Sequence, residues 1–196
     1  MATTAADLQE RLEPRPARRA SAAGPVVNDF SVQVATANGS GSQSSNTVLL
    51  RAIFQMGVPV SGKNLFPSNI AGLPTWYTIR ASKDGYLARK KEVDLLVAMN
   101  PETAREDVLG LPQGSAVVFD EPLGLSALRQ DLTFYPVPFD KVVAPLTADA
   151  RLRKLLRNMA YVGVVARLLE IEMAEVEKAI ARVFPGKAKA RELNAA

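Results

Sequence analysis

Apolar positions recur at two different periods along the chain, and the change of period separates predicted strands from predicted helices. Short runs rich in β-branched and aromatic residues are typical of strands. The nearly continuous apolar run VDLLVAMN is typical of a buried strand in a parallel sheet. Strands are therefore predicted at residues 30–37, 58–60, 76–82, 93–100 and 115–121. An extended segment at 133–140 contains prolines, which favour a sheet edge.

Helical spacing of apolar residues marks the remaining segments. It predicts a helix over 44–57, with Ser44 or Ser45 as its N-cap and Gly57 just after its end. Further helices are predicted at 101–111, which proline opens, and from about Thr147 onward at 150–171 and 173–184. Asn158 lies among apolar neighbours within this last region, as a satisfied buried amide or as a contact between helices.

The alternation of strands and helices predicts an α/β fold. We expect a three-layer sandwich with a mainly parallel or mixed central sheet and a helical C-terminal part. The polar stretch 61–75 is rich in Gly and Pro and is predicted to be a long loop that packs on a partner. The domain is predicted to span 28–190. Residues 1–27 are predicted to be a disordered extension, with one short helix around 5–12.

The amino-acid composition excludes several kinds of catalytic and metal site. Its 196 residues are 47% hydrophobic and include no cysteine and no histidine. Disulfides, an iron–sulfur cluster held by this chain alone, a Ser-His-Asp triad and a histidine-based metal site are therefore excluded. No apolar run is long enough to span a membrane, and no apolar signal region opens the chain. The net charge of +4 is not organised as a nucleic-acid face. The cytoplasm is the expected location, with neither nucleic acid nor membrane as a partner.

The stretch ATANGSGSQSSNTVLL places a glycine-rich turn between a predicted strand and a predicted helix, an arrangement that often holds phosphate. It departs from the dinucleotide fingerprint, because Ser44 stands where the third glycine belongs. The acidic residue that would bind a ribose is also missing, since no Asp or Glu occurs between Phe30 and Lys83. It is not a P-loop either, because no Gly-Lys-Ser/Thr follows the turn.

Every charged residue in the window 30–83 is basic. The free N–H groups of a helix start attract anions, and nearby cations would favour a polyanion. Lys63 or Arg80 is expected to be the nearest cation. A turn that merely connects strand and helix remains the alternative.

Trp76 and Tyr77 are expected in the core or an interface rather than against a ligand. No catalytic residue and no metal ligand is assigned, and the candidate ligand-binding residues are Gly39, Ser40, Gly41, Ser42, Gln43, Ser44, Lys63, Asn64 and Arg80.

Long strings of the sequence resemble the gamma-type domain of the 2-oxoacid:ferredoxin oxidoreductases. The resemblance runs from about Val27 to the end of the chain and is most specific at 38–46, at PVSGKNLFPSNIAGLPTWYTIR and at DLLVAMNPET. It is closest to the gamma domain that opens the alpha subunit of the 2-oxoglutarate enzyme. The turn is often written with more glycines elsewhere in the family. Here Ser42 and Ser44 replace two of them, which is consistent with the oxoglutarate-type branch.

The resemblance implies part of an enzyme that oxidatively decarboxylates a 2-oxoacid to an acyl-coenzyme A and passes the electrons to ferredoxin. It implies that this chain binds coenzyme A and closes the active site. Thiamine diphosphate, magnesium and a [4Fe–4S] cluster would lie on partners, namely the thiamine-binding C-terminal region of the alpha subunit and the beta subunit. The chain alone would then be inactive. The resemblance leaves open a truncated alpha subunit or a separately encoded gamma subunit. A stand-alone nucleotide-binding or regulatory module of the same fold is the alternative.

Overall fold

A mixed sheet forms the centre of the molecule. The computed structural model describes residues 28–67 and 70–195, so the predicted extension at 1–27 and its short helix lie outside the described residues. Within them, six strands lie in the order β2-β3-β1-β4-β5-β6. Strands β1, β4, β5 and β6 run parallel, whereas β3 is antiparallel to both β1 and β2. The strands are β1 (Asp29–Ala37), β2 (Val60–Leu65), β3 (Pro74–Ser82), β4 (Leu95–Ala98), β5 (Ala116–Asp120) and β6 (Thr133–Val137).

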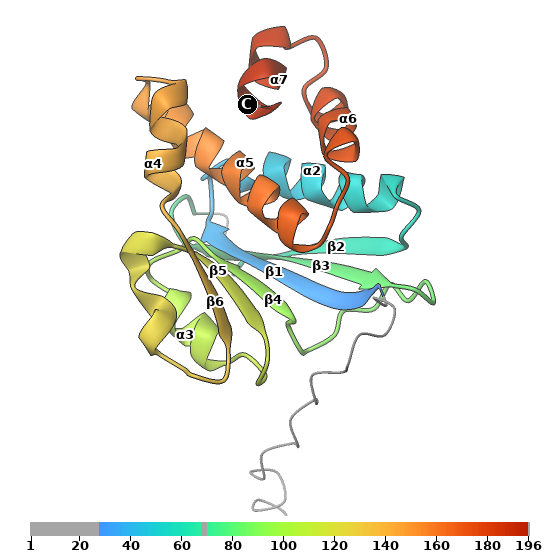
Figure 1. Ribbon diagram of the computed structural model, residues 1–196, viewed down its shortest axis with the longest axis vertical. Helices are drawn as coiled ribbons and strands as arrows, with labels where there is room; N and C mark the ends of the chain where they lie inside the picture. The colour runs from blue at the N-terminus through green and yellow to red at the C-terminus, as the bar shows by residue number, and fades with distance from the viewer. Residues whose placement is uncertain (1–27, 68–69, 196) are drawn as a thin grey trace, which may run out of the picture.

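Helices cover the two faces of the sheet unequally (Figure 1). The long helices α2 (Ser42–Gln55), α5 (Ala150–Leu168) and α6 (Met173–Val183) lie on one face. The short helix α3 (Ala104–Leu109) lies on the other face. Helix α4 (Phe139–Val143) links β6 to the helical C-terminal part, which ends in α7 (Ala188–Ala195). Short 3-10 helices occupy Glu121–Leu123, Leu125–Ala127 and Ala144–Leu146.

Alternation along the strands divides the apolar core into two clusters, one on each face. Val32 and Val34 of β1 belong to the larger cluster, together with residues of α2, α5 and α6. Ala35 of the same strand belongs to the smaller cluster, where Val108 of α3 packs. The face under α3 is apolar over β4 and β5, whereas the half over β1 and β3 carries polar side chains such as Ser31 and Arg80.

The predicted α/β fold, its mixed sheet and its helical C-terminal part are confirmed. The edge position of the proline-containing segment is also confirmed, since β6 ends the sheet. The predicted loop at 61–75 is wrong, because Val60–Leu65 pairs with β3 as an edge strand and β3 already begins at Pro74. The predicted strand at 58–60 contributes only Val60. Helix α7 was not predicted.

The length and hydrophobicity of the helices can be compared with those of membrane-spanning helices. No helix in the described part of the chain combines the length and the apolar character needed to cross a bilayer.

Candidate functional site

Two left-handed glycines shape the connection between β1 and α2. Gly39 has φ of 77° and Gly41 has φ of 86°, a region that side chains rarely adopt. The turn is closed by a 3.1 Å hydrogen bond from Ser40 N–H to the carbonyl of Ala37. Helix α2 begins at Ser42, and no side chain caps it, so the predicted N-cap at Ser44 or Ser45 is wrong. The left-handed Gly41 occupies the cap position and lets the chain enter the helix earlier.

A cavity of about 430 Å³ opens beside this turn, between the start of α2 and the sheet. It brings together Gly39, Gly41, Ser42, Gln43 and Asn64 of the predicted site. The other lining residues are Thr36, Asn38, Asn46, Phe66, Thr75 and Tyr77. Every lining residue is uncharged, and the first turn of α2 carries no acidic side chain. The cavity is therefore a neutral polar site at a helix N-terminus, where anions are favoured over cations.

Hydrogen bonds between lining residues hold the cavity wall in shape. Thr36 Oγ1 and Ser42 Oγ lie 2.9 Å apart and share a hydrogen bond. Asn64 Nδ2 of β2 donates to Gln43 Oε1 of α2 over 2.6 Å, which ties the edge strand to the helix start. Asn38 fixes the far rim, because its N–H donates to the carbonyl of Leu73 and its carbonyl accepts from Gly72 N–H.

Lys63 does not share the face on which the cavity lies. In the register of β2 and β3, Asn64 stands opposite Tyr77, and both line the cavity. Lys63 stands opposite Thr78, one position along. Successive side chains of a strand point to opposite faces, so Lys63 lies on the other side of the sheet.

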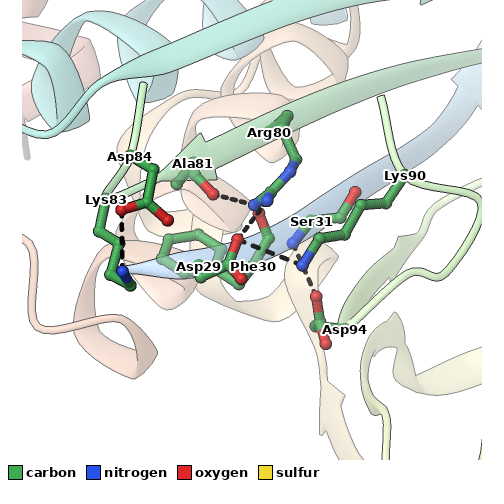
Figure 2. A network of polar contacts seen from close by, with 9 residues as sticks. All are labelled: Asp29, Phe30, Ser31, Arg80, Ala81, Lys83, Asp84, Lys90 and Asp94. Atoms are coloured by element: carbon green, nitrogen blue, oxygen red, sulfur yellow. Dashed lines mark hydrogen bonds and ion pairs between the residues drawn. The ribbon is translucent and has the colours of Figure 1, made fainter. Parts of the chain in front are cut away.

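Arg80 lies at the other end of the sheet and already has partners (Figure 2). It stands opposite Ser31 in β1, six residues before Ala37, which amounts to about 20 Å along the strand. Its buried guanidinium donates to the carbonyls of Phe30 and Ala81 and pairs with Asp29. The hydrogen bond from Arg80, together with one from Lys90, lowers the pKa of Asp29. The geometry gives Arg80 a structural role and does not bring it to the glycine turn.

Helix α5 supports the turn from behind. Asn158 Nδ2 donates to the carbonyl of Ser40 over 2.8 Å. The hydroxyl of Tyr161, which is fully buried, donates to Asn46 Oδ1 over 2.7 Å and lies 3.4 Å from the carbonyl of Ser42. Asn158 is thus both a satisfied amide and a contact between elements. Ser40 takes part in the site through its main chain, and neither Ser40 nor Ser44 lines the cavity.

Sequence reasoning missed buried residues of the cavity that carry polar groups, among them Asn46 and Tyr77. Asn46 is 2% exposed and follows Ser42 by one helical turn, so the spacing could have placed it on the same face. Tyr77 is 7% exposed and was expected in the core. Its ring does pack there, but its position opposite Asn64 brings it into the cavity lining. Burial raises its pKa.

The chain is similar to known proteins in both sequence and fold. The sequence profile of the family described as pyruvate ferredoxin/flavodoxin oxidoreductase matches residues 31–196. No curated protein sequence matches the chain. The solved structure of 2-oxoglutarate:ferredoxin oxidoreductase from Magnetococcus marinus, with 2-oxoglutarate, coenzyme A and succinyl-CoA bound, is similar at 23% identity and a TM-score of 0.74. The similarity covers 85% of this chain but only 29% of that one.

Two shorter chains share the fold over almost their whole length. A pyruvate oxidoreductase subunit from Thermotoga maritima is 16% identical with a TM-score of 0.66, covering 86% of this chain and 92% of that one. The gamma subunit of a keto/oxoacid ferredoxin oxidoreductase from Geobacter sulfurreducens is 16% identical with a TM-score of 0.67, covering 85% and 92% respectively. At these identities the likeness concerns the fold.

Proposed function

The chain belongs to the pyruvate ferredoxin/flavodoxin oxidoreductase family, and from this premise we propose that it is the coenzyme A-handling part of a 2-oxoacid:ferredoxin oxidoreductase. Residues 28–190 form its gamma-type domain in this proposal. The enzyme joins a 2-oxoacid to coenzyme A, releases carbon dioxide and passes two electrons to ferredoxin. The oxoacid is proposed to be 2-oxoglutarate, a choice supported by the sequence resemblance and by the ligands of the Magnetococcus marinus enzyme.

The observation that carries the proposal is the uncharged cavity at the start of α2. Its volume of about 430 Å³ lies within the range of small-molecule sites. Free N–H groups at a helix start and the absence of a lining carboxylate favour an anion there. Coenzyme A carries a diphosphate and a further phosphate, so we place one phosphate-bearing part of it at the glycine turn. The remainder of the molecule would extend toward the partner that holds the thiamine intermediate.

The remaining cofactors are assigned to other domains or subunits. A chain without cysteine or histidine offers no thiolate for a cluster and no imidazole for a metal. Within 28–67 and 70–195, no group of three or more acidic side chains is placed to hold a metal ion. Thiamine diphosphate with magnesium and the [4Fe–4S] cluster are therefore proposed to lie on a thiamine-binding alpha region and a beta subunit. We place the assembled enzyme in the cytoplasm.

Two measurements test this function. Isothermal titration of the purified chain with coenzyme A should give saturable binding. Reduction of a viologen dye with 2-oxoglutarate and coenzyme A should require the thiamine-binding partners and should be absent for the chain alone. Dye reduction by the isolated chain would contradict the subunit assignment. Failure of a tagged chain to capture a thiamine-binding partner would favour a stand-alone nucleotide-binding module instead.

A further inference from the structure

We propose that two buried neutral groups, Nδ2 of Asn46 and the hydroxyl of Tyr77, donate hydrogen bonds to a phosphate bound at the glycine turn. The site then recognises an oxyanion without help from a lysine or arginine. The identity of the natural ligand, coenzyme A, rests on the proposed function. The recognition chemistry rests on the described residues and applies to phosphate groups in general.

Asn46 is oriented by a residue far along the chain. Its Oδ1 accepts the 2.7 Å hydrogen bond from Tyr161, whose hydroxyl is held in the core by α5. Because the carbonyl side of the amide faces Tyr161, the Nδ2 side faces away from it. Asn46 lines the cavity, and its side chain makes no other hydrogen bond within the described residues. A 2% exposed amide therefore has a donor that no protein group uses.

Tyr77 provides the second donor from the sheet. Its hydroxyl lies over β2, where a Cβ on Gly62 would stand only 2.2 Å from it. The missing side chain at Gly62 thus leaves room for the phenol over the edge strand, while Tyr77 as a residue lines the cavity. Burial raises the pKa of Tyr77, so its hydroxyl keeps its proton at neutral pH and remains a donor. Tyr77 and Asn46 come from opposite walls, the sheet and α2, and both line the same cavity.

The main chain at the start of α2 offers further hydrogen-bond donors beside these side chains. The carbonyls of Ser40 and Ser42 face α5, where they lie within reach of Asn158 and Tyr161. The first N–H groups of α2 have no partner within the helix and no capping side chain, so they are free for an anion. With Lys63 on the other face of the sheet and Arg80 paired with Asp29, the lining contributes no formal charge. Neutral donors give an affinity that depends weakly on salt, unlike a site built on ion pairs.

The test uses the full chain and two probes, inorganic pyrophosphate and coenzyme A, by isothermal titration. Asn46→Asp keeps the size of the side chain and an acceptor for Tyr161, but replaces the donor with a negative oxygen. We expect it to weaken both probes about tenfold or more. Tyr77→Phe removes one oxygen and should weaken them about threefold to tenfold. Gln33→Glu adds the same negative charge on the opposite face, beside Thr78, and should leave both affinities unchanged.

Salt separates the neutral site from a cationic one. Raising sodium chloride from about 50 to about 300 mM should change the dissociation constant of pyrophosphate by less than about threefold, whereas a site with two ion pairs would lose about tenfold or more in affinity.

Unchanged affinity in Asn46→Asp and Tyr77→Phe overturns the inference while leaving coenzyme A binding in place. Loss of pyrophosphate binding in both variants, with no binding of coenzyme A to the wild type, supports the inference and overturns the proposed ligand. If neither probe binds the folded wild type, both proposals fail. Thermal unfolding midpoints establish that each variant folds. If Asn46→Asp does not fold, Tyr77→Phe and the salt series decide.

Discussion

Asn158 of α5 donates a 2.8 Å hydrogen bond to the main-chain carbonyl of Ser40, a residue 118 positions earlier in the chain. Through this contact a helix from the C-terminal part of the domain holds the glycine turn at the other end of the sequence. The Leu155 side chain packs beside it, against Gly41. The shape of the turn is therefore a property of the tertiary structure and not of the turn sequence alone.

Removing the amide of Asn158 should loosen this support. Asn158→Ala leaves the carbonyl of Ser40 without its partner, and an unmade hydrogen bond at a partly buried group costs about 1–3 kcal/mol. Urea denaturation should show this loss in the free energy of unfolding. Asn64→Ala is the matched control, because Asn64 is exposed and, among the described residues, its side chain bonds that of Gln43 alone. A change of less than about 0.5 kcal/mol is expected there. Equal losses in the two variants would contradict a supporting role for α5.

Gly41 should matter for backbone conformation more than for space in the cavity. A Cβ at this position would stand 2.3 Å from Leu155 Cδ2, on the side of α5 and not of the cavity. Leu155 is 44% exposed and can rotate away, so the left-handed φ of 86° is the main cost. Gly41→Ala should lower the free energy of unfolding by about 1–2 kcal/mol, with little effect on coenzyme A affinity.

Gly57 offers the comparison for that variant. It has φ of 79°, and no heavy atom lies within 4 Å of the point where a Cβ would stand, so Gly57→Ala reports the conformational cost alone. We expect the two variants to agree within about 0.5 kcal/mol in urea denaturation. A much larger loss for Gly41→Ala would mean that Leu155 is held rigidly against the turn.

The Asp29–Arg80 pair predicts a specific pH dependence of stability (Figure 2). Because Arg80 and Lys90 lower the pKa of Asp29 in the folded state, its contribution is present above the unfolded pKa of about 3.9. It is lost as the pH falls through the lower folded pKa. Asp29→Asn should therefore be less stable than wild type at pH 7, and the difference should shrink below about pH 4. Chemical denaturation at a series of pH values measures it. A difference that stays constant from pH 7 to pH 3 would rule out the ion pair as the cause.

The rim of the cavity should bind a partner through exposed apolar side chains. Phe66 is 52% exposed and Ile70 is 64% exposed, on the connection between β2 and β3. Such side chains near a polar site mark an interface. Phe66→Ser with Ile70→Ser should weaken assembly with the proposed thiamine-binding partner without lowering the unfolding midpoint of the free chain. Analytical ultracentrifugation of the mixture measures assembly. Val142→Ser, on the exposed side of α4, is the control and should assemble normally.

Local patterns were sufficient for most of the fold. Apolar alternation located β1 and β3, and helical spacing located α2, α5 and α6, because burial on one face dictates both periods. Strand β2 escaped prediction because its residues are mostly polar and it is stabilised by pairing with β3 at the sheet edge. The start of α2 was misplaced because a left-handed glycine, and not a serine hydroxyl, occupies the cap position.

The candidate site was less predictable than the fold. The glycine turn and its free helix start were visible in the sequence, and Asn64 was assigned with them. The expected cations were misplaced, because the face of Lys63 depends on the register of an unpredicted strand. The supporting contacts of Asn158 and Tyr161 join segments more than a hundred residues apart, and no local pattern reports such contacts.

The two edge strands of the sheet affect how readily the unassembled chain aggregates. Strand β2 presents Gly62, Lys63 and Asn64, and β6 carries Pro136 just before Pro138. Charge, glycine and proline at an edge all discourage a second strand from pairing there. A subunit made in excess of its partners would thus resist edge-to-edge aggregation, even with an apolar rim exposed. Its contacts with other chains are then made by side chains, and such contacts can dissociate without breaking hydrogen bonds between strands.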